Sequence, residues 1–183
     1  MYYAEHDSPV GLLTLTATDK GLSGLYFEEH KYFTGTRDRQ RQPDQVHLRD
    51  ARQQLDEYFL RRRTAFDIPL DLQGTPFQRE VWQALLALPF GCTSTYSMVA
   101  QHVARPNAVR ATGTAIGRNP LSIIVPCHRV LGMSGALSGY AGGLERKRFL
   151  LALEKEMGEI RGAGTSMMIV AACEPCKELQ PGG

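Results

Sequence analysis

The spacing of apolar residues changes along this chain, and the change limits the folds that it can adopt. Between residues 13 and 18, leucine or alanine alternates with threonine, which is typical of a half-buried strand. A turn at 19–21 leads into a second apolar run at 22–27, so the sequence predicts a β-hairpin. Turn residues before position 13 make residues 2–6 a further strand of the same sheet.

The rest of the first half contains a polar stretch and then a helix. Residues 30–45 hold many charged and few apolar side chains, which predicts a surface loop. Apolar residues recur at helical spacing over 48–62, and we expect this helix to cover the sheet. The periodicity breaks down over 67–74, so we place the end of a first domain at residue 73.

The second half has the periodicity of helices. Thr75 suits a helix N-cap and Pro76 the first helical position. Two short helical stretches, 97–104 and 107–116, are separated by Arg105 and Pro106, as in a helix-turn-helix.

The end of the chain contains a loop, a helix and a tail. Glycines make 132–143 a loop, and 144–156 reads as a closing helix. We therefore expect an α+β protein with a second, mainly helical domain over 74–156 and a tail over 157–183.

The charge of the chain is concentrated in one segment. Residues 74–154 carry eight arginine and lysine residues against three glutamates, whereas the whole chain has a net charge of only +2. Such a local excess suits a polyanion such as nucleic acid, but a solvated basic face explains the charge equally well. No stretch approaches the roughly 18 apolar residues of a membrane span, so we expect a cytoplasmic protein, or a nuclear one in a eukaryote.

One of the four cysteines is placed for chemistry. Four cysteines are too few and too unevenly spaced for a disulfide framework, so reduced thiols are expected. Cys127 follows an apolar run and precedes His128 and Arg129, two residues that could make its thiolate accessible. In an arbitrary sequence, a structural core cysteine next to a surface His-Arg pair is the more frequent explanation.

Seven short motifs then occur in a fixed order, and together they resemble a known family, the O6-alkylguanine-DNA alkyltransferases. The family is also called the methylated-DNA-protein-cysteine methyltransferases. The similarity covers residues 74–154 and weakens before them. The motifs are Gly74-Thr75-Pro76-Phe77-Gln78 with Val81-Trp82, Thr95-Tyr96, Arg110-Ala111-Thr112-Gly113, Asn119-Pro120, Pro126-Cys127-His128-Arg129-Val130, Gly139-Tyr140-Ala141-Gly142-Gly143 and Leu153-Glu154.

The resemblance implies direct-reversal DNA repair in one irreversible turnover. Cys127 would take the alkyl group of O6-methylguanine, and also that of O4-methylthymine. His128 would accept the thiol proton through a water, while Glu154 orients the histidine. Tyr96 would donate a proton to the departing base. The resemblance further implies a ribonuclease H-like N-terminal domain.

The resemblance also implies how the damaged base is reached and held. Asn119, Val130, Tyr140 and Ala141 would form the base pocket, with Asn119 bracing the active-site segment. The base must leave the duplex stack, and Arg110 would fill the space it vacates. The small residues Ala108, Ala111, Thr112 and Gly113 would let their helix approach the minor groove, with Arg105 and Arg118 on phosphates.

The expected partner is therefore double-stranded DNA that contains O6-alkylguanine, without a membrane or an obligate protein partner. No cofactor or metal is expected. The N-terminal half has histidines but no cysteine for a zinc site, and Cys173 and Cys176 are only half of one. Two other functions fit parts of the sequence: a helix-turn-helix regulator without catalysis, and a thiol hydrolase that uses Cys127 and His128.

Overall fold

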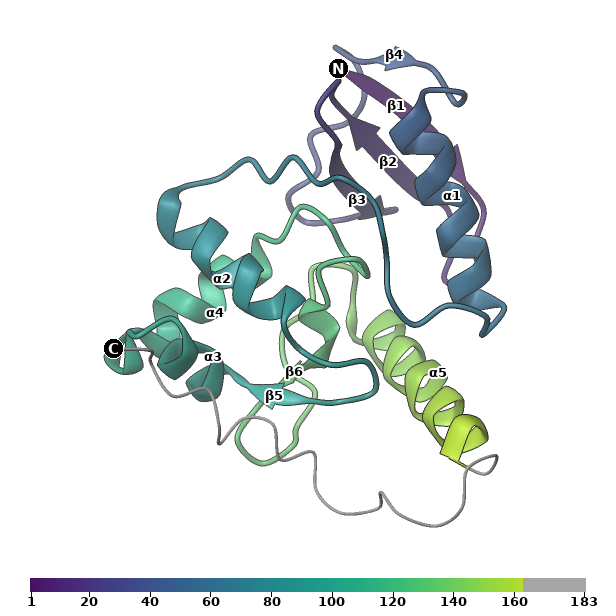
Figure 1. Cartoon of the computed structure of the whole chain (residues 1–183). Helices are drawn as coiled ribbons and strands as arrows, with labels where there is room; N and C mark the ends of the chain where they lie inside the picture. Colours follow the sequence, from purple (N-terminus) through teal and green to yellow (C-terminus); the bar gives the residue numbers. More distant parts are fainter. Residues whose placement is uncertain (163–183) are drawn as a thin grey trace.

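The N-terminal part of the computed structural model is a four-stranded sheet with the strand order β3-β2-β1-β4 (Figure 1). Strands β1 (Tyr2–His6), β2 (Leu13–Ala17) and β3 (Leu22–Phe27) pair antiparallel, so the three predicted strands are confirmed. The structure describes residues 1–162. The expected tail therefore lies largely outside the described residues, and so do Cys173 and Cys176.

The fourth strand corrects the prediction of an uninterrupted loop over residues 30–45. Strand β4 (Gln40–Arg41) pairs parallel to β1, and the Gln42 amide also donates to the Tyr3 carbonyl over 2.9 Å. Both residues of β4 are exposed. Because backbone groups alone make this pairing, no apolar alternation marks it in the sequence.

Helix α1 (Val46–Phe59) covers the sheet, as predicted, but ends three residues earlier than expected. The Gln45 side chain caps its first turn by accepting from the Leu48 amide over 3.1 Å. Four side chains of α1 are buried: Leu48, Ala51, Leu55 and Tyr58. Burial of each large apolar side chain stabilises the fold by about 1.5–3 kcal/mol, so this stripe fixes α1 and the position of Tyr58.

The second part of the chain is helical, as predicted. Helix α2 (Pro76–Leu86) begins with a capping box in which Thr75 and Gln78 bond each other's backbone amides. Helix α3 (Tyr96–His102), the 3-10 turn η1 (Pro106–Ala108) and helix α4 (Val109–Gly117) follow. The Trp82 indole donates to the Ala115 carbonyl over 2.9 Å, which holds α4 against α2.

Three further elements complete the fold. Strands β5 (Ser94–Thr95) and β6 (Val130–Leu131) pair parallel, and the sequence does not predict them. The 3-10 turn η2 (Cys127–Arg129) immediately precedes β6. Helix α5 (Leu144–Gly162) extends past the expected end of the closing helix at residue 156. Among residues 1–162, none of the helices combines the length and the apolar character that a membrane span requires.

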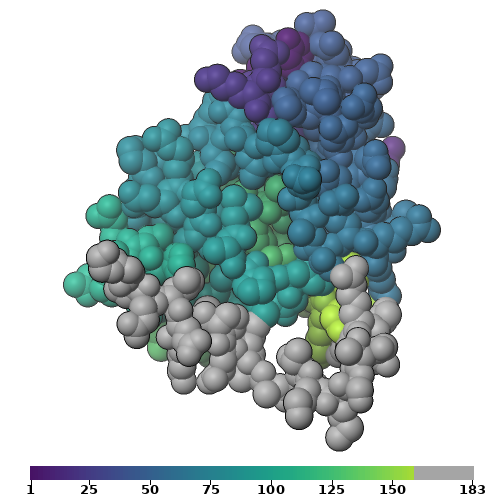
Figure 2. Space-filling model, in the orientation of Figure 1, coloured from purple at the N-terminus to yellow at the C-terminus, as the bar shows by residue number. Residues whose placement is uncertain are grey.

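The sheet contacts the segment that leads to Cys127. The Leu25 amide of β3 donates to the Pro120 carbonyl over 2.8 Å, and the Ser122 amide donates to the Leu25 carbonyl over 3.2 Å. Buried residues of both parts of the chain form one hydrophobic cluster. Figure 2 shows the two parts packed together, with later segments, in green, visible between them. The N-terminal domain therefore supports the segment 120–127.

The close approach of Gly142 to Phe27 gives a test of this packing. A Cβ atom at Gly142 would lie 2.2 Å from Cδ2 of Phe27, whose side chain is 1% exposed and has little room to move. We expect Gly142→Ala to lower the free energy of unfolding by about 1–3 kcal/mol, measured by urea denaturation.

Gly117→Ala is the matched control, because a Cβ at Gly117 meets nothing within 4 Å and Gly117 lies in α4. Alanine at this position should leave stability unchanged or raise it by up to about 1 kcal/mol. Equal effects of the two substitutions would contradict the packing described for Gly142.

Candidate active site

Asn119 organises the chain around Cys127. Its side-chain amide donates to the Val125 carbonyl over 2.8 Å and lies 3.0 Å from Sγ of Cys127. Its carbonyl oxygen accepts from the Leu121 amide over 3.0 Å. Asn119 is only 2% exposed, so these bonds satisfy a buried side chain and fix the turns on both sides of it.

The same segment contains a strained residue. Ile123 has a φ of 70°, a left-handed conformation that is unfavourable for a β-branched side chain. Such a conformation costs on the order of 1–3 kcal/mol and persists only where the surroundings enforce it. Ile123 is 1% exposed, and its neighbours Ser122 and Val125 are held by backbone bonds to Leu25 and Leu121.

Cys127 is a free, buried cysteine with a high pKa. Burial raises the pKa of the thiol to about 11, although the Asn119 hydrogen bond and the charge of Lys147 oppose this shift. At neutral pH the sulfur therefore holds its proton, and any nucleophilic role of the thiol would require a group that accepts this proton.

His128 and Glu154 form a buried pair. Nε2 of His128 lies 2.8 Å from Oε1 of Glu154, whereas Nδ1 is buried without a hydrogen-bond partner. A proton on Nε2 leaves the lone pair of Nδ1 free to accept from a water. Burial lowers the pKa of His128 despite the opposing effect of Glu154, so the imidazole is neutral at pH 7.

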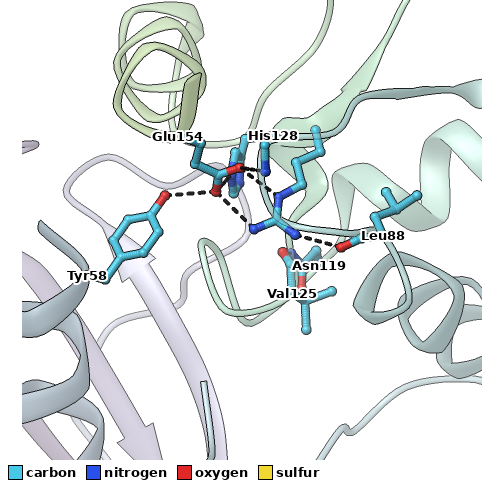
Figure 3. Close-up of polar contacts among 8 residues, drawn as sticks. Tyr58, Leu88, Asn119, Val125, His128 and Glu154 are labelled. Atoms are coloured by element: carbon cyan, nitrogen blue, oxygen red, sulfur yellow. Dashed lines mark hydrogen bonds and ion pairs between the residues drawn. The ribbon is translucent and has the colours of Figure 1, made fainter. Parts of the chain in front are cut away.

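Glu154 receives hydrogen bonds from several elements. Oε1 accepts from the hydroxyl of Tyr58 over 3.0 Å and Nη2 of Arg129 over 3.0 Å, in addition to His128 (Figure 3). Oε2 accepts from Nε of Arg129 over 2.9 Å and from the Gly91 amide over 3.2 Å. Burial alone would raise the pKa of this carboxyl, but His128 and Arg129 outweigh it and hold the pKa at about 2.

Two residues of this hydrogen-bond network make contacts that the sequence did not predict. Tyr58 reads in the sequence only as a core residue of its helix, and no pattern connects it with Glu154. Arg129 was expected near the thiol, but its guanidinium faces Glu154, lies over the Phe90 ring and donates to the Leu88 carbonyl over 2.7 Å.

Lys147 is a third residue that the sequence analysis missed. It is fully buried, and its ammonium group donates to the carbonyls of Val130 over 2.6 Å and Ser138 over 2.9 Å. It thereby ties β6 to the loop 132–143. Its spacing of three from Leu150 and seven from Glu154 places it on the buried stripe of α5, and this spacing could have revealed it.

A narrow recess opens beside Cys127. Eight residues line it: Ile116, Gly117, Asn119, Ser122, Cys127, Gly139, Tyr140 and Ala141. Three of the four predicted pocket residues are among them, whereas Val130 is fully buried and does not line the recess. The cavity volume is about 10 Å³, which is room for about one water. A purine would therefore require the loop 132–143 to move.

Tyr96 lies at the start of α3 and contacts the same loop. Its hydroxyl donates to the Ser138 carbonyl over 3.0 Å, the carbonyl that also accepts from Lys147. Gly113 of α4 lies against the Tyr96 ring, because a Cβ there would be 3.5 Å from Cδ1. Tyr96 can donate to a base only after it releases Ser138.

The residues expected to bind DNA lie on α4 and its flanks. Arg110 and Ala111 are exposed, and Ala108 and Gly113 are partly exposed. Thr112 is fully buried, which corrects its assignment to the DNA-binding surface. Its position places it with Ala115 and Ile116 on the core face of the helix. The exposed small residue that the sequence analysis missed is Thr114.

Arg105 and Arg118 are both exposed and both have local contacts. Arg105 pairs with Glu80 over 3.3 Å, and its guanidinium lies 5.6 Å from the centre of the Phe77 ring. The guanidinium of Arg118 lies 5.7 Å from the centre of the Tyr32 ring in the N-terminal domain. Within residues 1–162, no cluster of three or more His, Cys, Asp or Glu residues could hold a metal ion.

Comparison with protein families matches both parts of the chain. The DNA-binding domain of 6-O-methylguanine DNA methyltransferase matches residues 76–156, and the ribonuclease-like domain of the same protein matches residues 1–72. A methylated-DNA-protein-cysteine methyltransferase of Mycolicibacterium paratuberculosis is 47% identical over 156 residues, which cover 84% of this chain and 92% of the relative. That of Methanosarcina acetivorans is 44% identical over 84% of this chain and 98% of its own.

Solved structures agree with these matches. The crystal structure of Mycobacterium tuberculosis O6-methylguanine methyltransferase superposes with a TM-score of 0.78 at 46% identity, covering 85% of this chain and 93% of that one. The crystal structure of Mycobacterium tuberculosis OGT in complex with DNA gives a TM-score of 0.78 at 44% identity, over 86% and 94% of the two chains. The chain therefore belongs to the 6-O-methylguanine DNA methyltransferase family and is a methylated-DNA-protein-cysteine methyltransferase, which repairs alkylated DNA by transferring the alkyl group to a cysteine.

Proposed function

We propose that Cys127 is the cysteine that accepts the alkyl group. The observation that carries this assignment is the position of its sulfur. Sγ lies beside the recess under Tyr140 and Ala141, and the buried His128-Glu154 pair belongs to the same site. A carbon–sulfur bond forms as the bond between the alkyl carbon and O6 of guanine breaks. The product is a thioether, which has no leaving group for hydrolysis, so each protein molecule reacts once.

The thiol proton passes to His128 in this mechanism. Because the pKa of Cys127 is about 11, the sulfur loses its proton during the attack rather than before it. The unpartnered Nδ1 of His128 is the buried acceptor, and one water would bridge it to the sulfur. Glu154 then stabilises the imidazolium that forms at Nε2.

Tyr96 supplies the proton that the departing guanine needs. The phenol lies at the edge of the loop that covers the recess, and it donates to the Ser138 carbonyl in the free protein. Entry of the base would move this loop and free the hydroxyl for a ring nitrogen of guanine. Donation to the ring stabilises the negative charge that develops as the alkyl group leaves.

DNA binding is assigned to the exposed face of α4. Arg110, Ala111 and Thr114 are exposed on this helix, and apart from Arg110 these side chains are small enough for close approach to the minor groove. Arg110 would fill the stack after the damaged base is rotated toward Cys127. Arg105 and Arg118 flank the helix and would contact phosphates, Arg105 after exchanging Glu80 for a phosphate oxygen.

The substrate is O6-alkylguanine in double-stranded DNA, together with O4-methylthymine. The relatives named above come from bacteria and archaea, whose DNA lies in the cytoplasm. A protein that repairs DNA in a cell of this kind would therefore be cytoplasmic.

Substitution of Cys127 tests the assignment of the acceptor. Cys127→Ser should abolish alkyl transfer from a methylated duplex, because the hydroxyl is a far weaker nucleophile than the thiol, and should leave DNA affinity within about twofold. Mass spectrometry should find one alkyl group on Cys127 of the parent protein after incubation and none on the variant. Continued transfer by Cys127→Ser, or several turnovers by the parent, would refute the assignment.

Substitution of Arg110 separates base rotation from chemistry. Rotation of the damaged base out of the duplex stack costs a few kcal/mol, and Arg110 would offset part of this cost by filling the vacated space. Arg110→Ala should therefore slow the repair of a methylated duplex by roughly a hundredfold. The reaction with free O6-methylguanine base, which needs no rotation, should be nearly unchanged. The measurement is a pair of single-turnover rates for the parent and the variant.

Arg49→Ala is the matched control for the loss of one positive charge. Arg49 is an exposed arginine on α1 that pairs with Asp50. Its substitution by alanine should leave both transfer rates unchanged. If Arg110→Ala slows both substrates equally, Arg110 supports the active site rather than base rotation.

A further inference from the structure

Tyr58 connects the N-terminal domain to the catalytic carboxylate. It lies in the last turn of α1, is 1% exposed, and donates its hydroxyl hydrogen to Oε1 of Glu154 over 3.0 Å. The rings of Phe59, Phe66 and Phe90 surround it, with centroids 5.3, 5.5 and 6.4 Å from its own. A hydroxyl in such an apolar environment needs a strong acceptor, and Glu154 provides one.

The oxygen that accepts from Tyr58 is the one that faces the histidine. Oε1 of Glu154 receives the Tyr58 hydroxyl, Nε2 of His128 and Nη2 of Arg129. His128 and Arg129 are neighbours in η2, whereas Tyr58 comes from the other domain. Donors to one oxygen share its negative charge, so each donor weakens the stabilisation that the oxygen gives to the others.

We propose that Tyr58 is a positioning residue that holds Glu154 and sets the proton affinity of His128, so that the N-terminal domain controls alkyl transfer at Cys127 without touching the base. This inference rests on the proposed function, because it concerns the proton acceptor of that reaction. Tyr58 acts through Glu154, the acceptor of its hydroxyl hydrogen.

The charges around His128 make Oε1 the decisive atom. His128 faces Glu154 and Lys147 from α5 and Arg129 from its own turn. Burial, Arg129 and Lys147 all lower the pKa of His128, and Glu154 is the group that raises it. Any change in the charge on Oε1 therefore moves the pKa of His128 directly.

Tyr58 stays a donor over the whole range in which His128 titrates. Burial first, and then the charge of Glu154, raises the pKa of Tyr58 well above its usual value of 10. Tyr58 therefore remains protonated at the pH of the reaction. The pH dependence then reports on His128 and not on the phenol.

Removal of the Tyr58 hydroxyl should shift the pH dependence of transfer. In Tyr58→Phe, Oε1 keeps more negative charge for the imidazolium, so the pKa of His128 rises. Because neutral His128 accepts the proton, the acidic limb of the transfer rate moves to higher pH by about half a unit to one unit. On that limb the rate falls by about three- to tenfold, while the plateau at higher pH changes little.

A second variant should shift the limb in the opposite direction. Replacement of Tyr58 by 3-fluorotyrosine keeps the ring and the hydroxyl but makes the phenol a stronger donor. The limb should then move to lower pH. Tyr26→Phe is the matched control, since Tyr26 is a partly buried tyrosine of β3 on the N-terminal sheet and should leave the limb in place.

The experiment measures single-turnover alkylation of Cys127 by a saturating O6-methylguanine duplex, from about pH 5 to about pH 9. We expect opposite shifts for the two Tyr58 variants, and no shift for Tyr58→Phe when Glu154→Gln is already present. Tyr58→Phe that lowers stability but leaves the limb in place would show a structural role only and overturn the proposal.

The remaining outcomes are also decisive. If Tyr58→Phe fails to fold, the fluorotyrosine variant decides, and an unshifted limb overturns the proposal. If the parent protein places no alkyl group on Cys127, the proposed function fails. If the parent transfers normally and neither Tyr58 variant shifts the limb, only the inference about Tyr58 fails.

Discussion

The structure depends on a charged carboxylate that is buried between the two domains. Glu154 is 1% exposed, and an unpaired charge at such a depth would cost several kcal/mol or more. Tyr58, Gly91, His128 and Arg129 all form hydrogen bonds with it. Burial alone would raise its pKa, but His128 and Arg129 outweigh this effect and hold the pKa at about 2. These four residues come from three places: α1, the loop that precedes β5, and η2. If these elements separated, the Glu154 carboxylate would lose its hydrogen-bond donors or become exposed to solvent.

In the proposed mechanism, this arrangement lets a buried thiol react at neutral pH. Cys127 is kept protonated by burial, while His128 is kept neutral and bound to Glu154 at one nitrogen. The other nitrogen is left without a partner, so the site is prepared to receive a proton only when one is released. In the proposed mechanism, the thiol keeps its proton until an alkyl carbon reaches it.

The loop 132–143 is held by contacts that are separate from the Glu154 network. The recess beside Cys127 holds about 10 Å³ in the free protein, and Tyr96 and Lys147 both hold the Ser138 carbonyl of the loop over it. In the proposed mechanism, entry of a base would require this loop to give up hydrogen bonds, none of which belongs to the Glu154 network. Chemistry and access depend on different sets of contacts.

Local periodicity, turn residues and short motifs predicted the three main strands, the helices and the motif around Cys127. They did not reveal β4, the buried position of Thr112 or the contact between Tyr58 and Glu154. These depend on which elements pack together: backbone pairing leaves no side-chain pattern, and the buried face of a short helix is chosen by its neighbours. The hydrogen bond between Tyr58 and Glu154 joins residues 96 positions apart in sequence, so it follows from the packing of the two domains and not from any local pattern.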